Sequence, residues 1–211
     1  MYGLLPVFVH KHLPKACPNC DHIMRWDSDI LCDACWDGIF RSTNHIPLEL
    51  SGVDATEVWL EYSDIVQGVM HQIKFGGGRH LAAALGRRMA RQKTKPQVDI
   101  ITPVPLSRRR QYARGYNQAQ EIARGMSAVW HIPMADVIQR PKQGRSQAQL
   151  DRVGRLHQTV NRYTCRHWLA GARVLLVDDT CTTGATLNAC AEQLYLCGAQ
   201  YVEGWAAAKG Q

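Results

Sequence analysis

The stretch Val174–Thr186, which reads VLLVDDTCTTGAT, carries the clearest signal for both the fold and a site. Its first four residues are apolar, which is typical of a parallel strand that is buried on both faces. Asp178 and Asp179 follow them, and open α/β sheets bind their ligands at this carboxyl end of the strands. The stretch therefore predicts a ligand site between a buried strand and the helix that comes next.

The residues that follow the two aspartates suit a phosphate group. Hydroxyl groups and the backbone N–H groups of a helix N-terminus can surround a phosphate, and Gly184 lets the backbone approach it closely. The hydroxyls belong to Thr180, Thr182, Thr183 and Thr186. Two carboxylates would repel that phosphate, so we expect them to accept hydrogen bonds from sugar hydroxyls instead. The stretch predicts a phosphorylated sugar as the ligand.

Strand and helix patterns alternate along the chain from residue 56 onward. The alternation predicts an α/β fold with a parallel sheet flanked by helices. The predicted strands are residues 56–62, 98–105, a short strand near Val137, 173–177 and 201–206, and the predicted helices are residues 64–74, 81–92, 115–130 and 184–196. We interpret the residues after Pro105 as a basic loop and Cys181 as a loop position.

Four cysteines near the start of the chain have the spacing of a metal site. Cys17, Cys20, Cys32 and Cys35 form the pattern C-x2-C-x11-C-x2-C, which offers two thiolate pairs to one tetrahedral zinc ion. Paired disulfides and metal-free core cysteines are the alternatives, and disulfides conflict with a reducing cytoplasm. We expect a structural zinc in a small module of residues 1–50, followed by a larger domain of residues 51–211.

The compartment is predicted from two signals that we do not find in the sequence. We see neither a signal peptide nor an apolar run of the roughly 20 residues that a membrane span requires, so we expect a cytoplasmic protein without a membrane span.

The other cysteines are Cys165, Cys181, Cys190 and Cys197, and they lack ligand spacing. Cys190 and Cys197 are interpreted as small core residues.

The positive charge of the chain is concentrated in one segment. Residues 103–167 contain twelve Arg and Lys but three acids, a net charge of +9, whereas the whole chain carries +7. Such a segment favours a phosphate-rich partner, either a small phosphorylated ligand or a nucleic-acid backbone. A solvated basic surface without a partner is the alternative.

At these motifs the sequence resembles a known family. VLLVDDTCTTGAT is similar to the phosphoribosyl pyrophosphate (PRPP) signature of type I phosphoribosyltransferases. The chain as a whole resembles the ComF family of bacterial competence and DNA-utilisation proteins. The resemblance covers the four-cysteine module and the segments 73–86, 103–119 and 145–163, in the order of the family.

The resemblance implies roles for individual residues. Asp178 and Asp179 would bind the ribose 2′ and 3′ hydroxyls of PRPP, which binds together with Mg²⁺. The loop that would hold the 5′-phosphate comprises Thr180, Thr182, Thr183, Gly184, Ala185 and Thr186. The pyrophosphate loop would be Pro105, Leu106, Ser107 and Arg108, and the flexible loop that closes over PRPP would include Arg140, Gln147 and Arg155. Thr180 and Cys181 depart from the usual hydrophobic and small residues of the motif, which leaves the local shape open.

Two functions remain compatible with these features. The first, favoured by the resemblance, is a protein that binds PRPP and single-stranded DNA in DNA uptake or in the use of DNA as a nutrient, with proteins of the uptake machinery as candidate partners. The second is an active phosphoribosyltransferase that transfers phosphoribosyl to an unidentified small acceptor. The DNA-binding candidates are Arg108, Arg109, Arg110 and Arg114. Tyr112, Tyr116, Trp130 and Trp168 could stack on bases, although each can equally be a core residue.

Overall fold

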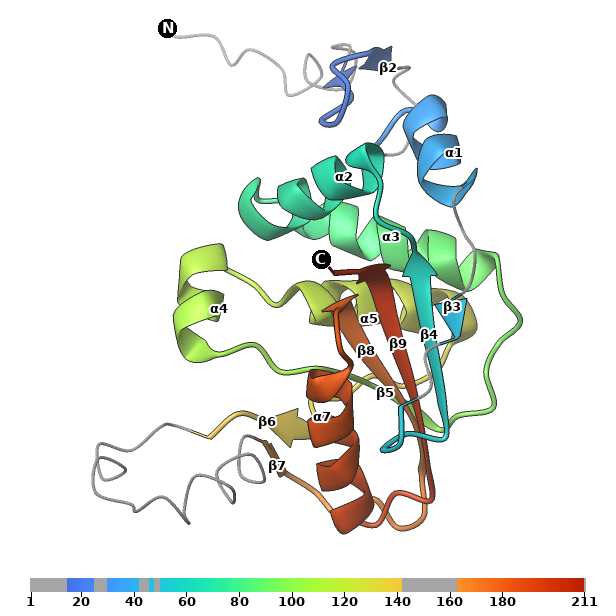
Figure 1. Ribbon diagram of the computed structural model, residues 1–211, viewed down its shortest axis with the longest axis vertical. Helices are drawn as coiled ribbons and strands as arrows, with labels where there is room; N and C mark the ends of the chain where they lie inside the picture. Colours follow the sequence, from blue (N-terminus) through green and yellow to red (C-terminus); the bar gives the residue numbers. More distant parts are fainter. Residues whose placement is uncertain (1–14, 25–29, 42–45, 48–49, 142–162, 211) are drawn as a thin grey trace, which may run out of the picture.

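A five-stranded sheet forms the centre of the computed structural model, which describes residues 15–24, 30–41, 46–47, 50–141 and 163–210 (Figure 1). The strand order is β3-β4-β9-β8-β5. The edge strand β3 (Ile46–Pro47) is antiparallel to β4 (Ala55–Leu60), and the other neighbours are parallel: β4 with β9 (Tyr201–Lys209), β9 with β8 (Arg173–Cys181), and β8 with β5 (Ile100–Pro103). The predicted α/β fold with a parallel sheet is confirmed.

Helices cover both faces of this sheet. The helices α3 (Arg79–Arg91) and α5 (Gln118–Trp130) pack against each other, and α5 contacts β8 and β5. The helix α7 (Ala185–Leu196) packs on β8 and β9. The remaining helices are α1 (Asp33–Arg41), α2 (Asp64–Phe75) and α4 (Arg108–Arg114), and two small antiparallel pairs join β1 (Lys15–Ala16) to β2 (Ile23–Met24) and β6 (Ile138–Gln139) to β7 (Thr164–Cys165). Within the described residues, no helix combines the length and the apolar character that a membrane crossing requires.

The strand β8 is buried on both sides because its side chains alternate between two hydrophobic clusters. Leu175 and Val177 belong to the cluster that includes α3 and α5, whereas Val174 and Leu176 belong to the cluster formed with α7. All four residues are fully buried. This explains why the strand reads as a continuous apolar run rather than as an alternating one.

Two glycines allow α3 and α5 to approach closely. A Cβ atom at Gly86 would lie 2.1 Å from the carbonyl oxygen of Ile122, and a Cβ atom at Gly125 would lie 2.1 Å from that of Ala83. Either distance is far shorter than a van der Waals contact, so a larger residue would push the helices apart. The pair of helices therefore forms a closely packed layer on this face of the sheet.

The segment after Pro105 differs from the prediction of a basic loop. Residues 108–114 form the helix α4, which begins at Ser107, whose Oγ accepts a hydrogen bond from the N–H of Arg110 at 3.4 Å. It ends at Gly115, whose φ of 77° places it in the left-handed region. Because Gly115 ends α4, the next helix begins only at Gln118 instead of at residue 115.

The strand β8 is longer than predicted. It continues from Val177 through the two aspartates to Cys181, and Thr180 and Cys181 still pair with Ala208 and Lys209 of β9. Cys181 is buried at the end of the strand, so its interpretation as a loop residue was wrong. The interpretation of Cys190 as a core residue is confirmed, whereas Cys197 is only half-buried.

The N-terminal part of the chain packs into the same core as the larger domain. Cys17, Leu31 and Trp36 share one hydrophobic cluster with Trp59 and Val66. The short strand β3 also joins the main sheet through β4. The division of the chain at residue 50 remains a prediction, but the two parts have a common interior.

Candidate functional site

A polar cavity of about 510 Å³ lies beside the carboxyl end of β8. It brings together segments that are far apart in the sequence: the end of α2, the residues after β5, helix α4, and the end of β8 with the residues that follow it. Its walls are Lys74, Val104, Pro105, Leu106, Ser107, Arg110, Arg114, Asn117, Arg140, Tyr163, Asp178, Asp179, Thr180, Thr182 and Thr186. Most residues of the predicted PRPP site therefore surround one cavity.

The two aspartates have different environments. Asp178 is buried, and its Oδ1 accepts a hydrogen bond of 2.8 Å from the N–H of Asp179. Burial, together with the neighbouring charge of Asp179, raises the pKa of Asp178 well above its ordinary value. The Oδ2 atom of Asp179 is also shielded, and no group in the described parts of the chain donates a hydrogen bond to it. A buried acceptor without a donor at a cavity wall is suited to a ligand hydroxyl.

Lys74 is a cation of this cavity that the sequence analysis did not identify. Its Nζ lies 3.3 Å from Oγ1 of Thr180 and 3.7 Å from Oδ2 of Asp179, the second being an ion pair too long for a hydrogen bond. The side chain of Lys74 is 23% exposed and that of Asp179 is 15% exposed, so water screens this pair only in part. Lys74 therefore balances part of the negative charge of the acid pair.

The predicted phosphate loop lies at the N-terminus of α7. Gly184 has a φ of 75° and precedes the first residue of that helix, and a Cβ atom there would lie 2.2 Å from Cδ2 of Leu50. Only glycine fits both the left-handed conformation and this space. Thr183 accepts a hydrogen bond of 3.4 Å from the N–H of Ala185. Thr182 and Thr186 line the cavity, whereas Thr183, Gly184 and Ala185 do not contribute to its walls.

The predicted pyrophosphate loop forms the opposite wall. Pro105, Leu106 and Ser107 face the cavity, and Arg110 and Arg114 of α4 face it as well. The loop is held in place by Asn117, whose Nδ2 donates a hydrogen bond of 2.9 Å to the carbonyl oxygen of Val104.

Arginines continue from this cavity into two neighbouring hollows. Arg108 does not line the central cavity but lines both hollows, one of about 260 Å³ and one of about 650 Å³. Arg109 lines the larger hollow only. Arg140 lines the central cavity and both hollows, and its guanidinium lies 5.6 Å from the ring centre of Tyr163. Gln147 and Arg155, the other two residues of the predicted flexible loop, lie outside the described residues.

The aromatic residues proposed for base stacking separate into two groups. Tyr116 and Trp130 are buried, and the hydroxyl of Tyr116 donates a hydrogen bond to the carbonyl oxygen of Ile73. Burial raises the pKa of Tyr116 to about 12. These two residues therefore belong to the core, whereas Tyr112 and Trp168 are 95% and 74% exposed.

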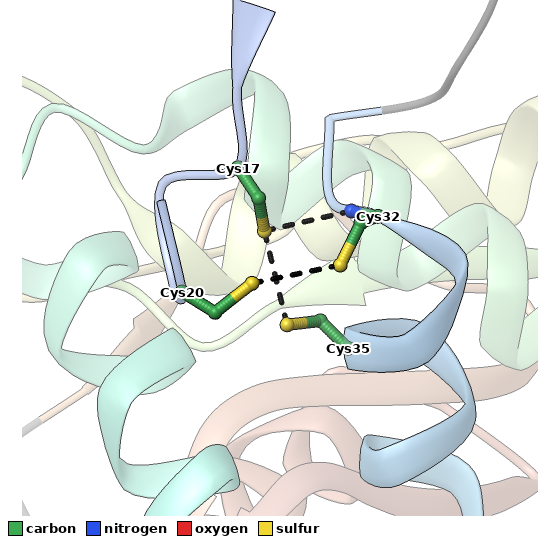
Figure 2. A group of neighbouring side chains, drawn as sticks. All are labelled: Cys17, Cys20, Cys32 and Cys35. Atoms are coloured by element: carbon green, nitrogen blue, oxygen red, sulfur yellow. Dashed lines mark hydrogen bonds between the residues drawn. The ribbon is translucent and has the colours of Figure 1, made fainter. Parts of the chain in front are cut away.

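The four predicted metal ligands converge at the N-terminal side of the molecule. Figure 2 shows the sulfur atoms of Cys17, Cys20, Cys32 and Cys35 pointing toward one another, with all four within 4.8 Å. The Sγ atoms of Cys17 and Cys35 are 3.8 Å apart, and those of Cys20 and Cys32 are 3.6 Å apart. A tetrahedron with metal–sulfur bonds of about 2.3 Å has edges of about 3.8 Å. The cluster therefore has the dimensions of a tetrahedral metal site.

The cluster is connected to helix α2 through Asn19. Its Nδ2 donates to the sulfur of Cys35 at 3.4 Å, and a Cβ atom at Gly68 of α2 would lie 2.6 Å from its Oδ1. Burial acts to raise the pKa of Cys17, but nearby backbone N–H groups, first that of Cys32 at 3.5 Å, lower it to about 7. Such donors favour a thiolate, which is the form that binds a metal.

The chain is similar in sequence to bacterial proteins whose names refer to DNA utilisation and competence. It is 28% identical over 203 residues to the DNA utilization protein YhgH of Escherichia coli K12, covering 90% of this chain and 88% of that protein. It is 31% identical over 154 residues to the competence protein F of Haemophilus influenzae, covering 70% of this chain and 67% of that protein. No protein-family model matches the chain.

Solved structures with a similar backbone include the glutamine PRPP amidotransferase of Bacillus subtilis. That similarity has a TM-score of 0.49 and an identity of 19%, and it covers 65% of this chain and 30% of the other. The family itself follows from the sequence relatives, because the competence protein F is more than 30% identical to this chain over two thirds of its length. The chain belongs to the ComF family, with the competence protein F and the DNA utilization protein YhgH.

Proposed function

We propose that this protein binds PRPP together with Mg²⁺ in the central cavity and single-stranded DNA on the adjoining basic surface, and that it acts in DNA uptake or in the use of DNA as a nutrient. The role in DNA handling is supported by the relatives, whose names refer to competence and DNA utilisation. The observation that carries the proposal is the meeting of the acid pair and the arginine-bearing loop in one cavity.

The cavity has complementary groups for each part of PRPP. Asp178 and Asp179 offer acceptors for the ribose hydroxyls, and the shielded Oδ2 of Asp179 has no donor among the described residues. Thr182 and Thr186 lie beside the N-terminus of α7, where backbone N–H groups favour a phosphate. Carboxylate and hydroxyl oxygens are also the ligands that Mg²⁺ accepts, and a bound Mg²⁺ would neutralise the charge of the pyrophosphate.

The basic surface next to the cavity offers unpaired positive charges. Arg108, Arg109 and Arg110 are exposed and line the hollow of about 650 Å³ together with Arg140. In the part of the chain that the structure describes, no acid forms an ion pair with the three consecutive arginines. Cations that no protein carboxylate neutralises are available to phosphodiesters.

The two aspartates favour a position of DNA beside the central cavity rather than inside it. Deoxyribose has no 2′ hydroxyl, and the 3′ oxygen inside a DNA strand is esterified, so neither can donate a hydrogen bond to Asp178 or Asp179. A phosphodiester near two carboxylates would also be repelled. The cavity therefore favours a free ribose diol, and the arginines of α4 favour the polynucleotide.

The DNA-binding part is tested by fluorescence anisotropy with single-stranded DNA over a salt series. We expect micromolar or tighter binding at low salt and a slope of log affinity against log salt above about 2 in magnitude, since each neutralised phosphate contributes about 0.7. Replacing Arg108, Arg109 and Arg110 by Gln should lower the slope by up to about 2. A charge-matched control replaces the exposed Arg41, Arg91 and Lys95, which do not line these cavities, and should leave most of the slope.

The second candidate function is phosphoribosyl transfer from PRPP to a small acceptor, with release of pyrophosphate. It is favoured by Arg110, Arg114 and Arg140, which surround the cavity and could stabilise the leaving pyrophosphate. Release of pyrophosphate, measured against a panel of bases and amines, tests it. Rapid release with one acceptor, combined with no DNA binding at low salt, would favour the enzyme over the DNA-binding protein.

We propose zinc as the metal of the four-cysteine cluster, in a structural role, because four thiolates complete its tetrahedral shell. We place the protein in the cytoplasm, where the thiols remain reduced. Proteins of the DNA-uptake machinery are further candidate partners.

A further inference from the structure

Phe75 is a large aromatic residue at the end of α2 that contributes little to the core. Its side chain is 66% exposed, whereas Val66, Val69, Met70 and Ile73 of the same helix are buried. Single exposed hydrophobic residues are common on protein surfaces, so exposure alone carries no function. Phe75 differs from such residues because it lies next to two residues of the central cavity.

Phe75 does not line the central cavity, but it adjoins two residues that do. Lys74, the residue before it, points inward and contacts Thr180 and Asp179. Arg114, which lines the cavity, places its guanidinium 5.4 Å from the ring centre of Phe75. The ring therefore lies beside a cation of α4, and the residue that precedes it in α2 reaches Thr180 and Asp179.

Two contacts fix this end of α2. The buried hydroxyl of Tyr116 donates a hydrogen bond to the carbonyl oxygen of Ile73, and the N–H of Gly76 donates one of 2.9 Å to that of Gln72. The ring of His71 lies 5.1 Å from that of Phe75, at an angle of 45°. A ring on a fixed helix end loses little freedom when a second ring stacks on it.

We propose that Phe75, flanked by Arg114, is a stacking platform for an unstacked base of single-stranded DNA whose phosphodiesters lie on the arginines of α4. This inference rests on the proposed DNA-binding function. Proteins that bind single strands combine a basic path for the backbone with aromatic rings for the bases, and arginine beside an aromatic ring adds to the stacking. The ends of α2 and α4 provide both elements side by side (Figure 1).

Two other exposed aromatic rings, those of Trp168 and Tyr112, fit this role less well. Trp168 packs on Gly198, where an added Cβ atom would lie 2.7 Å from its ring. Gly198 follows the end of α7 and precedes the start of β9, so Trp168 lies near the amino ends of the strands, whereas the cavity lies at the carboxyl end of β8. Tyr112 belongs to α4 but is 95% exposed, with no ring or cation contact among the described residues. Trp168 therefore offers a matched control for Phe75.

The test compares two oligonucleotides by fluorescence anisotropy: a thymidylate dodecamer and an abasic dodecamer with the same phosphodiesters and no bases. Phe75→Leu keeps an apolar side chain but removes the ring. We expect it to weaken binding of the thymidylate strand by about 5- to 150-fold, the range for one stacked base, without weakening binding of the abasic strand. Phe75→Trp should restore the affinity, and its added fluorescence should be quenched by the thymidylate strand. Trp168→Leu should behave as the unmodified protein.

The outcomes separate this inference from the function on which it rests. Equal affinity of Phe75→Leu and the unmodified protein for the thymidylate strand would overturn the platform and leave DNA binding intact. A parallel loss for both strands would also overturn it, because Phe75 would then act on the backbone site rather than on a base. If the unmodified protein bound neither strand at low salt, the proposed DNA-binding function would fail, and the platform with it. Circular dichroism and thermal unfolding of each variant establish that the fold is retained.

Discussion

The Nζ atom of Lys74 lies 3.7 Å from Oδ2 of Asp179 and so connects the end of α2 to the end of β8 at the wall of the central cavity. A carboxylate pair without a nearby cation would repel both its own members and an anionic ligand. Lys74 offsets this charge while leaving Oδ2 of Asp179 without a hydrogen-bond donor from the described residues. The contact therefore offsets part of the negative charge of the acid pair and leaves Oδ2 of Asp179 available to a ligand.

Replacing Lys74 by Met should weaken PRPP binding by about tenfold, which corresponds to about 1.4 kcal/mol for the loss of one interaction with a charged group. Titration calorimetry with Mg²⁺ and PRPP measures this change. Lys74→Arg should recover part of the affinity, and Lys95→Met, an exposed lysine away from the cavity, should have no effect. Unchanged affinity in Lys74→Met would remove Lys74 from the site.

Replacing Asp179 by Ala should reduce the free energy of PRPP binding by about 1 to 3 kcal/mol, the range for a lost hydrogen bond to a charged group. The same calorimetric titration measures it. If PRPP bound the variant with both Asp178 and Asp179 replaced by Ala as tightly as the unmodified protein, the motif would be a structural relic without a role in binding.

Asp178→Asn should stabilise the folded protein at neutral pH while weakening PRPP binding. The pKa of Asp178 is raised by burial, so folding favours its protonated form. The stability that this carboxyl contributes is complete below its ordinary pKa and is lost as the pH rises through the raised pKa of the folded state. Asn keeps the acceptor that Asp178 offers to the N–H of Asp179 but cannot ionise.

Chemical denaturation of both proteins between acid and neutral pH checks this expectation. The difference in the free energy of unfolding should grow as the pH rises, because only the unmodified protein must ionise a buried carboxyl. A constant difference across the range would show that Asp178 has an ordinary pKa.

Cys32→Ser should remove the bound metal and lower the melting temperature of the whole chain by roughly 10 °C, the shift that a loss of about 3 to 5 kcal/mol causes at this size. The reason is the shared interior: Cys17, Leu31 and Trp36 pack in one cluster with Trp59 and Val66. Metal analysis by mass spectrometry and calorimetric unfolding measure the two effects. Cys165→Ser, at a half-buried cysteine outside the cluster, is the control. Full zinc content and normal folding of Cys32→Ser would refute the assignment.

The elements that the sequence predicted well are those whose burial leaves a periodic pattern. The run Val174–Val177 is apolar because both faces of β8 are covered, and this pattern is visible without a structure. Ser63 is a typical capping residue directly before the predicted helix 64–74, and its Oγ accepts a hydrogen bond of 3.4 Å from the N–H of Val66. The cysteine spacing likewise predicted a cluster of four sulfur atoms, and these atoms lie within 4.8 Å of one another.

The features that the sequence could not give depend on tertiary contacts or on local caps. The helix α4 has no buried residue, so it has no apolar periodicity, and Ser107 and Gly115 define its ends. Lys74 and Phe75 are ordinary residues of an amphipathic helix until the fold places them beside Thr180 and Arg114. The burial of Tyr116 was equally open, because an aromatic residue among arginines is compatible with a core or a surface position.

Arg140 lines the central cavity and both neighbouring hollows, so one residue borders three compartments. An anion that recruits Arg140 in one compartment alters the potential in the other two, and this links their occupancies. Linkage between two sites is reciprocal: the factor by which one ligand changes the affinity of the second is the factor by which the second changes the affinity of the first. In the proposed function, bound PRPP and bound single-stranded DNA would then change each other's affinity through the position of the Arg140 side chain.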